Sequence, residues 1–248
     1  MMRNALLLVL TALLSGSTAP AEEIVLTNAN VIDGVAPNPL ENQAVVVRDG
    51  RIVEIVAASA APASGRRYDL AGKYVLPGLI DAHVHLASSA QARRALLSGI
   101  TTVRSMGTSN FADVGLRELA ERGTIASPEV LASGYHVRPT PAEPLFLDDP
   151  SLADLYTGVH GPDAFRRVAA ANLERGVDWI KITSTERAGL PDTDPRKQTM
   201  TREEIVAVVD EATRRGVPVA CHAHGDEGGR AAVDAGVRSI EHGTYLSE

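Results

Sequence analysis

Residues 201–222 have the sequence TREEIVAVVDEATRRGVPVACH, which contains one complete unit of a repeating pattern. Thr201 and Glu204 have the spacing of a capping box, which predicts the start of a helix. Gly216 suits the left-handed cap that ends a helix, and residues 217–222 are apolar enough for a buried strand. Between these ends, apolar residues recur at helical spacing and predict one buried helix face, namely Ile205, Val208, Val209 and Ala212.

The junction of a glycine with a following β-branched residue recurs from Leu79 onward. Its members are Gly99-Ile100, Gly176-Val177, Gly216-Val217 and Gly236-Val237, with Gly123-Thr124 as a weaker one. Another helix is expected to begin at Pro162 and to bury Phe165, Val168, Ala169 and Leu173. We expect six strands in this region, at 79–86, 100–105, 128–135, 177–182, 217–222 and 237–242.

Alternating strands and helices predict an α/β fold with a parallel sheet and helices outside it. We interpret residues 78–248 as the first six units of a TIM-like (β/α) barrel, which is therefore incomplete. The alternative is a doubly wound sheet. No glycine-rich phosphate loop follows the first strand, so the dinucleotide-binding form of that fold has no support.

The segment 22–77 has a different pattern, with short strands rich in β-branched residues and no helical periodicity. Asp49-Gly50 lies between two of these strands and is a strong signal for a tight hairpin. We expect a small N-terminal β-sandwich layer here.

Residues 1–21 have the features of a signal peptide. Arg3 supplies a positive charge, Ala5 to Leu14 are apolar, and Ala19-Pro20-Ala21 offers a small-residue cleavage site. The apolar run is too short to span a bilayer, which takes roughly 20 residues. We therefore expect export to the periplasm or the medium, without a stable membrane anchor.

The composition excludes some classes of function. Of the 248 residues, 44% are hydrophobic and 22% charged, which is ordinary for a globular protein. The formal charge of −7 argues against nucleic-acid binding, which requires a basic surface. Cys221 is the single cysteine, so no intrachain disulfide can form.

Histidines gather at the predicted carboxyl ends of the strands, which form the active-site face of a parallel barrel. The first group is Asp81-Ala82-His83-Val84-His85. Because side chains alternate along a strand, Asp81, His83 and His85 are expected to point the same way. Two such imidazoles can chelate an ion such as zinc, and Asp81 could orient one of them from the second shell. The alternative is a pair of hydrogen-bonded core histidines.

Lys181 lies inside the apolar strand Asp178-Trp179-Ile180-Lys181-Ile182-Thr183. Burial of an unpaired ammonium is costly and lowers its pKa. The neutral amine is a nucleophile that could capture carbon dioxide as a carbamate, an anionic ligand able to bridge two metal ions. The alternative is a lysine whose head reaches solvent at the strand end.

Two further groups follow the fifth and sixth predicted strands. They are Cys221-His222-Ala223-His224-Gly225 and Ser239-Ile240-Glu241-His242-Gly243. At least one of His222 and His224 is expected to bind metal, and the other to contact substrate.

The chain resembles the amidohydrolase superfamily. Val75-Leu76-Pro77-Gly78-Leu79-Ile80-Asp81-Ala82-His83-Val84-His85 is similar to the opening of the barrels of that superfamily. Three further stretches resemble its prolidase-like branch, which is related to imidazolonepropionase: Gly99-Ile100-Thr101-Thr102-Val103-Arg104, His222-Ala223-His224-Gly225 and Ser239-Ile240-Glu241-His242-Gly243.

The resemblance implies a site with two divalent ions, taken as zinc. His83 and His85 would hold one ion, His222 and His242 the other, and Lys181 as a carbamate would bridge them. His136 and His224 would contact substrate. The segment Val137-Arg138-Pro139 and the pair Arg104-Ser105 depart from the family pattern.

The resemblance also implies seventh and eighth strands, the eighth with an aspartate that binds metal and moves protons. This sequence ends at Glu248, and such barrels need about 250 residues. We therefore expect a truncated sequence or a fragment of a longer product, inactive as it stands.

For the complete protein, the implied activity is hydrolysis of an amide or peptide-like C–N bond by a metal-activated water, with Lys181 and His242 as catalytic residues. The substrate would be a small-molecule amide or a dipeptide. The alternatives are a deaminase with one metal ion, against which Lys181 argues, and a catalytically dead remnant. The sequence does not fix the oligomeric state, and a homo-oligomer is one option.

Overall fold

The computed structural model describes residues 23–247. The predicted signal peptide lies outside these described residues. The chain divides into two compact units at the Pro77–Gly78 bond, and each is described by itself. Within the described residues, no helix is long and apolar enough to cross a membrane.

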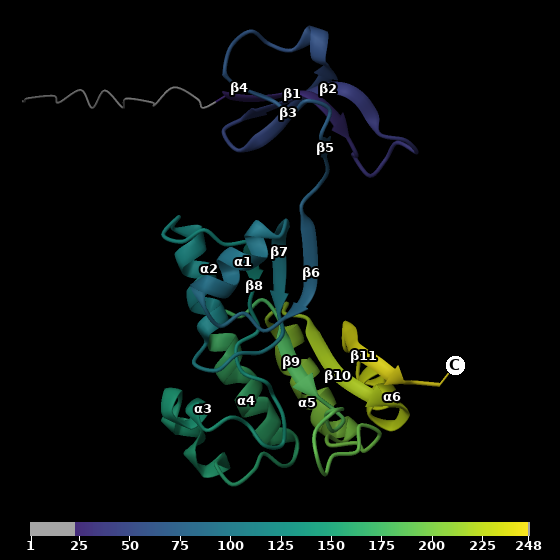
Figure 1. Ribbon diagram of the computed structural model, residues 1–248. Helices are drawn as coiled ribbons and strands as arrows, with labels where there is room; N and C mark the ends of the chain where they lie inside the picture. Colours follow the sequence, from purple (N-terminus) through teal and green to yellow (C-terminus); the bar gives the residue numbers. More distant parts are fainter. Residues whose placement is uncertain (1–22, 248) are drawn as a thin grey trace, which may run out of the picture. The chain divides into compact units, whose positions relative to one another are not determined.

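The N-terminal unit is one five-stranded sheet (Figure 1). β1 pairs antiparallel with β2 and parallel with β4 and β5, and β2 pairs antiparallel with β3. The expected β-sandwich is not confirmed, because residues 23–77 form a single sheet rather than two packed sheets. The elements are β1 (Glu23–Val31), β2 (Leu40–Arg48), β3 (Arg51–Ala57), the short 3₁₀ helix η1 (Ala58–Ala60), β4 (Arg66–Asp69) and β5 (Tyr74–Val75).

The predicted hairpin between β2 and β3 is confirmed. Arg48 pairs with Arg51, and the two residues between them have φ values of 51° at Asp49 and 74° at Gly50. Two positive φ angles define the turn that matches the twist of the flanking strands.

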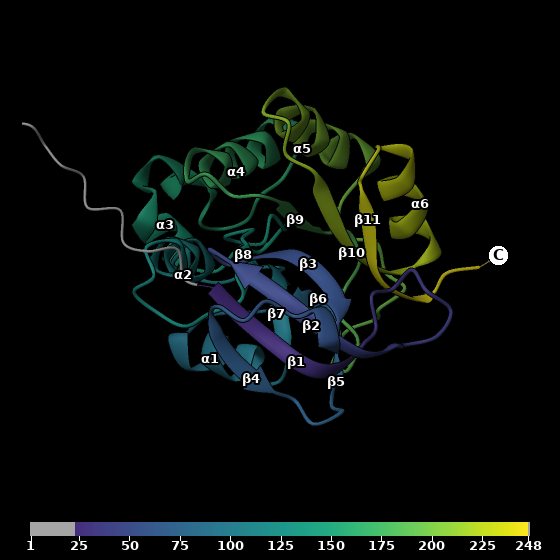
Figure 2. The same cartoon turned by 90° about the horizontal axis from the view of Figure 1, so that it is seen from above.

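The second unit alternates parallel strands with helices, as the sequence predicts. In Figure 2, α4, α5 and α6 lie along one side of β9, β10 and β11. Its strands are β6 (Leu79–Val84), β7 (Ile100–Ser105), β8 (Glu129–Leu131), β9 (Ile180–Thr183), β10 (Val219–Gly225) and β11 (Ser239–Tyr245). Its helices are α1 (Ser89–Leu97), α2 (Ala112–Glu121), α3 (Pro144–Asp148), the 3₁₀ helix η2 (Pro150–Leu155), α4 (Pro162–Glu174), α5 (Arg202–Arg214) and α6 (Asp226–Asp234).

The six strands lie in sequence order in two three-stranded sheets, β6-β7-β8 and β9-β10-β11. A parallel bridge between Val137 and Ile182 joins the two, and the Val137 N–H donates to the Lys181 carbonyl at 2.8 Å. This order and direction are those of consecutive units in a (β/α) barrel.

Local signals explain the ends of α5. The Thr201 hydroxyl accepts from the Glu204 N–H, and the Glu204 carboxylate accepts from the Thr201 N–H, so the predicted capping box is present. Gly216, with φ of 69°, follows the helix in the left-handed conformation that glycine adopts at little cost.

Some strand bounds differ from those predicted. β8 was expected to reach residue 135 but ends at Leu131, because the N–H groups of Ser133 and Gly134 donate to the Asp113 carboxylate instead of a neighbouring strand. β9 begins at Ile180 rather than 177, since the N–H groups of Asp178 and Trp179 both donate to the Ala132 carbonyl. β10 and β11 each begin two residues later than predicted and end three residues later.

Candidate metal centre

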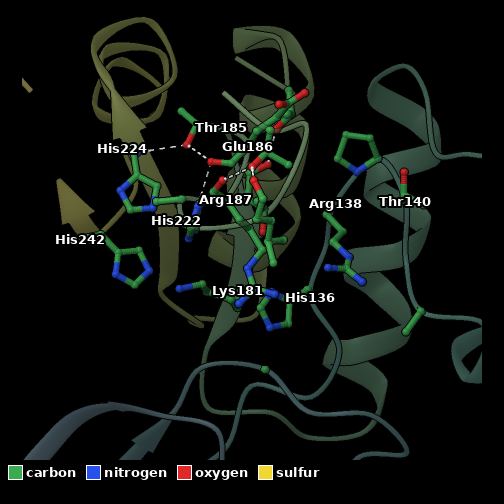
Figure 3. Close-up of a pocket in the computed structure, with 18 of the residues that line it drawn as sticks. His136, Arg138, Thr140, Lys181, Thr185, Glu186, Arg187, His222, His224 and His242 are labelled. Atoms are coloured by element: carbon green, nitrogen blue, oxygen red, sulfur yellow. Dashed lines mark hydrogen bonds between the residues drawn. The ribbon is translucent and has the colours of Figure 1, made fainter. Parts of the chain in front are cut away.

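A cavity of about 1100 Å³ lies in the second unit and gathers the predicted site residues other than Asp81. Six of the seven histidines of the chain line it together with Lys181, and Figure 3 shows His222, His224 and His242 on one side with Arg138 opposite them. The lining histidines are His83, His85, His136, His222, His224 and His242.

The six imidazole rings form one continuous array although they come from four separate stretches of chain. The His83 and His85 ring centroids lie 5.5 Å apart, and the His85 ring stacks on His136 at 5.7 Å. The His242 centroid lies 4.9 Å from His83, 4.7 Å from His222 and 5.0 Å from His224. His242 is therefore the centre of the array.

Hydrogen bonds fix which nitrogen of His83 and His85 can bind a ligand. Nδ1 of His85 lies 2.8 Å from the Gly107 carbonyl, and Nδ1 of His83 lies 2.6 Å from a carboxylate oxygen of Glu241. Since both partners accept hydrogen bonds, Nδ1 carries the proton in each neutral ring. Nε2 is then left with a free lone pair, which is the usual arrangement in a metal-binding histidine.

His222 and His224 are anchored differently. Nε2 of His222 faces the Glu186 carbonyl at 3.4 Å, a long contact that leaves Nδ1 as its accepting nitrogen. Nδ1 of His224 lies 3.0 Å from the Thr244 hydroxyl, and the His224 N–H donates to the Thr185 hydroxyl at 3.0 Å. Burial lowers the pKa of His222 to about 3 and also lowers that of His224, so both are neutral at pH 7.

Lys181 lies in the cavity wall with its amine out of contact with solvent. The side chain is 1% exposed, and within the described residues Nζ has no hydrogen-bond partner. Burial lowers the pKa of Lys181 to about 8, although the nearby Glu241 and Cys221 act in the opposite direction. The alternative of a lysine head at the solvent edge is therefore wrong, and a substantial fraction of the amine is neutral near pH 8.

The carboxylate of Glu241, in β11, contacts one residue of β6 and one of β7. The sequence alone did not identify Glu241 as a site residue. Its second carboxylate oxygen accepts from Arg104 at 2.6 Å, and Arg104 also stacks on the Trp179 ring at 4.5 Å. Burial alone would raise the pKa of Glu241, but the hydrogen bonds from His83 and Ser239 and the charges of Lys181 and Arg104 lower it to about 2. Glu241 is therefore an anion held between two cationic or polar neighbours.

His242 has a left-handed backbone, with φ of 75°. In a regular strand, consecutive side chains point to opposite faces. Here Glu241 and His242 both contact His83, because the positive φ turns the His242 side chain toward the same face. Such a conformation is uncommon for a residue other than glycine and costs of order 1–3 kcal/mol.

Asp81 is not near a histidine ring nitrogen in the described hydrogen bonds. Its carboxylate accepts from the backbone N–H of His83 at 3.1 Å. The contact predicted for Asp81, that of a carboxylate orienting a histidine ring, is made by Glu241. Within the described residues, the carboxylate of Asp81 thus contacts the backbone of His83 rather than a histidine ring.

Asp113 holds the two loops that carry Gly107 and His136. It is fully buried, and its carboxylate accepts from the Thr108 hydroxyl at 2.8 Å and from the N–H groups of Ser133 at 3.0 Å and Gly134 at 3.2 Å. Burial lowers the pKa of the neighbouring His136 to about 3, with Arg138 and Lys181 acting in the same direction.

Gly107 lies directly against the His136 ring. A Cβ at position 107 would be 2.0 Å from Cδ2 of His136, and φ at Gly107 is 114°. Any side chain here would both strain the backbone and displace the imidazole.

The donor set fits a divalent cation of borderline-soft character. Imidazoles with a fixed free nitrogen suit zinc and its neighbours, and the unpaired amine of Lys181 lies among them. As the side chains stand, no three His, Cys, Asp or Glu groups within residues 23–247 are close enough together to hold one ion.

The model of the amidohydrolase family matches residues 74–248, so this chain belongs to the amidohydrolase family. Members of this family generally bind divalent metals. The α/β fold is similar to the TIM-barrel-like structures of the family, as the sequence predicts.

Individual relatives support the prolidase-like resemblance. The solved structure of a Bifidobacterium longum protein described as a prolidase is 34% identical, with a TM-score of 0.75, and the match covers 91% of this chain and 55% of that one. Ochratoxinase of Aspergillus niger is 25% identical over 285 residues, which are 95% of this chain and 57% of the relative. Imidazolonepropionase of Mycolicibacterium smegmatis is 48% identical over 61 residues, 25% of this chain and 15% of the relative. This chain thus spans little more than half the length of the relatives that match it throughout.

Proposed function

We propose that this chain carries the metal-binding part of a hydrolase that cleaves an amide or peptide-like C–N bond. The observation that carries the proposal is the convergence of six histidines and an unpaired, buried lysine amine on one cavity. The names of its relatives, which include a prolidase and ochratoxinase, fit a hydrolase acting on C–N bonds.

We assign one ion to His83 and His85 and a second to His222 and His242, with Lys181 between them. His222 is preferred to His224 because its ring centroid lies closer to that of His242, at 4.7 Å against 5.0 Å. His136 and His224 are then free to contact substrate from opposite sides of the cavity. His242, at the centre of the array, has the position for a catalytic role beside the metal.

Lys181 would act as a carbamate. Its neutral amine adds to the carbon of carbon dioxide and loses one proton, which leaves a carboxylate on Nζ. This step replaces a neutral amine by a carbamate whose two oxygens share one negative charge, and it removes the cost of an amine without a hydrogen-bond partner within the described residues. The lowered pKa of about 8 favours it, because only the neutral amine reacts.

Bound divalent ions would supply Lewis acidity and a water of lowered pKa. The substrate class we propose is a small-molecule amide, such as a dipeptide or an N-acyl amino acid. The site of action is proposed to be outside the cytoplasm, after removal of residues 1–21, which have the signal-peptide pattern.

The experiment is a metal count on protein loaded with zinc in bicarbonate buffer, with Lys181→Ala and a matched control, Lys73→Ala, on the exposed surface of the other unit. We expect about two ions per chain for the wild type and the control, and loss of at least one ion in Lys181→Ala. Labelling with ¹³C-bicarbonate should give a carbamate NMR signal in the control but not in Lys181→Ala.

A wild type that binds only one ion, with that ion retained in Lys181→Ala, would overturn the carbamate and favour the single-metal deaminase. Two ions without hydrolysis of any amide would favour the catalytically dead remnant.

A further inference from the structure

The cavity is cationic although the chain as a whole is acidic. The chain has a formal charge of −7, yet four cationic side chains line the cavity and Glu186 is the single carboxylate among the described lining residues. Glu186 is already paired with Lys197 at 2.6 Å. Lys181 would be a carbamate in the proposed function, and the two other cations, Arg138 and Arg187, form no ion pair with any carboxylate of residues 23–247.

Arg138 is the more unusual of these two arginines. It is partly buried, and within residues 23–247 its Nε is completely buried without a hydrogen-bond partner. Burial and the charge of Arg187 both lower the pKa of Arg138, although an arginine remains charged. Burial of a guanidinium nitrogen without a hydrogen-bond partner lowers the free energy of unfolding, and no contact of the described residues offsets this loss.

Arg187 lies on the exposed loop that follows β9 and, like Arg138, lines the cavity. Arg187, Arg138 and His136 all line this cavity, and the charge of Arg187 helps to lower the pKa values of Arg138, His136 and His85. Figure 3 shows Arg138 on the side of the cavity away from His242, and Arg187 between Arg138 and the group His222, His224 and His242. Two like charges that face one cavity repel each other unless an anion lies between them.

We propose that Arg138 and Arg187 form a binding subsite for a carboxylate of the substrate. The planar guanidinium group presents paired N–H donors that match the two oxygens of a carboxylate. The inference rests on the proposed function for the position of the scissile bond, which would lie at the histidine array. Such a substrate would extend from the histidine array past His136 to the two arginines. Its scissile amide would lie at the array, and its free carboxylate would lie at the arginines.

The subsite selects among the substrates that the amidohydrolase chemistry allows. N-acyl amino acids and dipeptides have a carboxylate near the scissile amide, whereas ureas, thiocarbamates and nucleobases have none. The cavity of about 1100 Å³ is slightly larger than the usual small-molecule site of roughly 300–1,000 Å³, so it has room for such an acid. Arg138 and Arg187 are thus specificity residues and have no part in bond cleavage.

The test measures binding without chemistry. Matched pairs of N-benzoyl amino acids and their primary amides, with glycine, leucine and proline, are titrated calorimetrically into EDTA-treated protein. We expect at least one acid to bind ten-fold or more tightly than its amide, and we expect this preference to shrink as sodium chloride is added. Arg138→Met and Arg187→Met should each reduce the preference to less than three-fold.

Two further variants separate charge from packing. Arg138→Lys keeps the charge and should retain part of the preference, and Arg93→Met, on the exposed face of α1 outside the cavity, should retain all of it. Arg138→Met should also raise the melting temperature, because it removes an unpaired, partly buried charge. A structural role for Arg138 would lower the melting temperature instead.

Equal binding of acids and amides by the wild type, or no binding of either, would overturn the subsite. Preference retained in both arginine variants would overturn it as well. Acid preference that persists in a protein without metal binding or amidase activity would leave the subsite standing and remove the proposed function.

Discussion

The Glu241 carboxylate lies 2.6 Å from Nδ1 of His83, across 158 positions of sequence. The same carboxylate accepts from Arg104 at 2.6 Å, so one buried side chain of β11 ties together the first two strands of the second unit. The contact links the geometry of the candidate metal centre to the stability of the fold.

Replacement of Glu241 by glutamine should destabilise the protein strongly. The amide keeps the shape but removes the negative charge, which leaves Arg104, only 14% exposed, without its ionic partner. Loss of one partner from a buried pair costs about 3–5 kcal/mol. Urea denaturation at pH 7 measures the free energy of unfolding. Glu118→Gln, in an exposed pair with Arg122, is the control and should change it by less than about 1 kcal/mol. Equal effects of the two variants would contradict the role of Glu241.

Acid should destabilise the metal-free protein through His136. Its pKa is about 3 in the folded chain and 6.5 as the reference value, so between these values the unfolded state binds more protons. The stability is therefore fully present above pH 6.5 and is lost as pH falls toward 3, by at most about 1.4 kcal/mol per pH unit for one group.

The measurement is urea denaturation of EDTA-treated protein from pH 7 to pH 4. His136→Gln should give a shallower dependence of stability on pH than the wild type. His160→Gln, at an exposed position outside the cavity, should leave the slope as it is. A slope unchanged by His136→Gln would show that burial of His136 does not control this part of the acid sensitivity.

Asp113→Asn should loosen the two loops beside His136. One oxygen of the buried carboxylate accepts hydrogen bonds from two backbone N–H groups. An amide NH2 group in the place of this oxygen is itself a donor, so it could not accept either bond. We expect a loss of about 2–4 kcal/mol. Hydrogen exchange should show faster exchange at Ser133 and Gly134, while amides in the middle of α4 serve as the internal reference. Unchanged protection at these two amides would refute the assignment.

The backbone conformation of His242 predicts that glycine is more stabilising than alanine at this position, which is the reverse of the usual order of stability. Alanine normally stabilises a chain relative to glycine, but at a φ of 75° glycine is the less strained residue. His242→Gly should therefore be more stable than His242→Ala by about 1 kcal/mol. The same pair at Glu54, an exposed β3 position without a positive φ, should show the ordinary order. Alanine more stable than glycine at both positions would mean that His242 is unstrained.

Local sequence signals were sufficient for much of the fold. β7 has the bounds predicted from the Gly99-Ile100 junction, and α5 begins at the predicted capping box. These features depend on residues within a few positions of each other. The bounds of β8 were wrong because Asp113, outside that strand, takes the backbone N–H groups of Ser133 and Gly134.

Long-range contacts account for what the sequence missed in the site. Strand alternation would place Glu241 and His242 on opposite faces. No residue pattern in the sequence predicts the positive φ of His242, which brings both side chains to His83. Arg138 and Arg187 lie on two loops without periodicity, so their common cavity was invisible before the chain was folded. The histidine groups were predictable because the carboxyl ends of parallel strands meet at one face.

The contact between Gly107 and the His136 ring has a practical consequence for redesign of the cavity. A larger residue at position 107 would clash with the His136 ring, so substitutions at this position cannot be used to change the shape of the cavity. The exposed run from Arg187 to Leu190 can be varied, except at Gly189, where φ of 75° favours glycine. Variant libraries aimed at new substrates should vary that run and keep Gly107 unchanged.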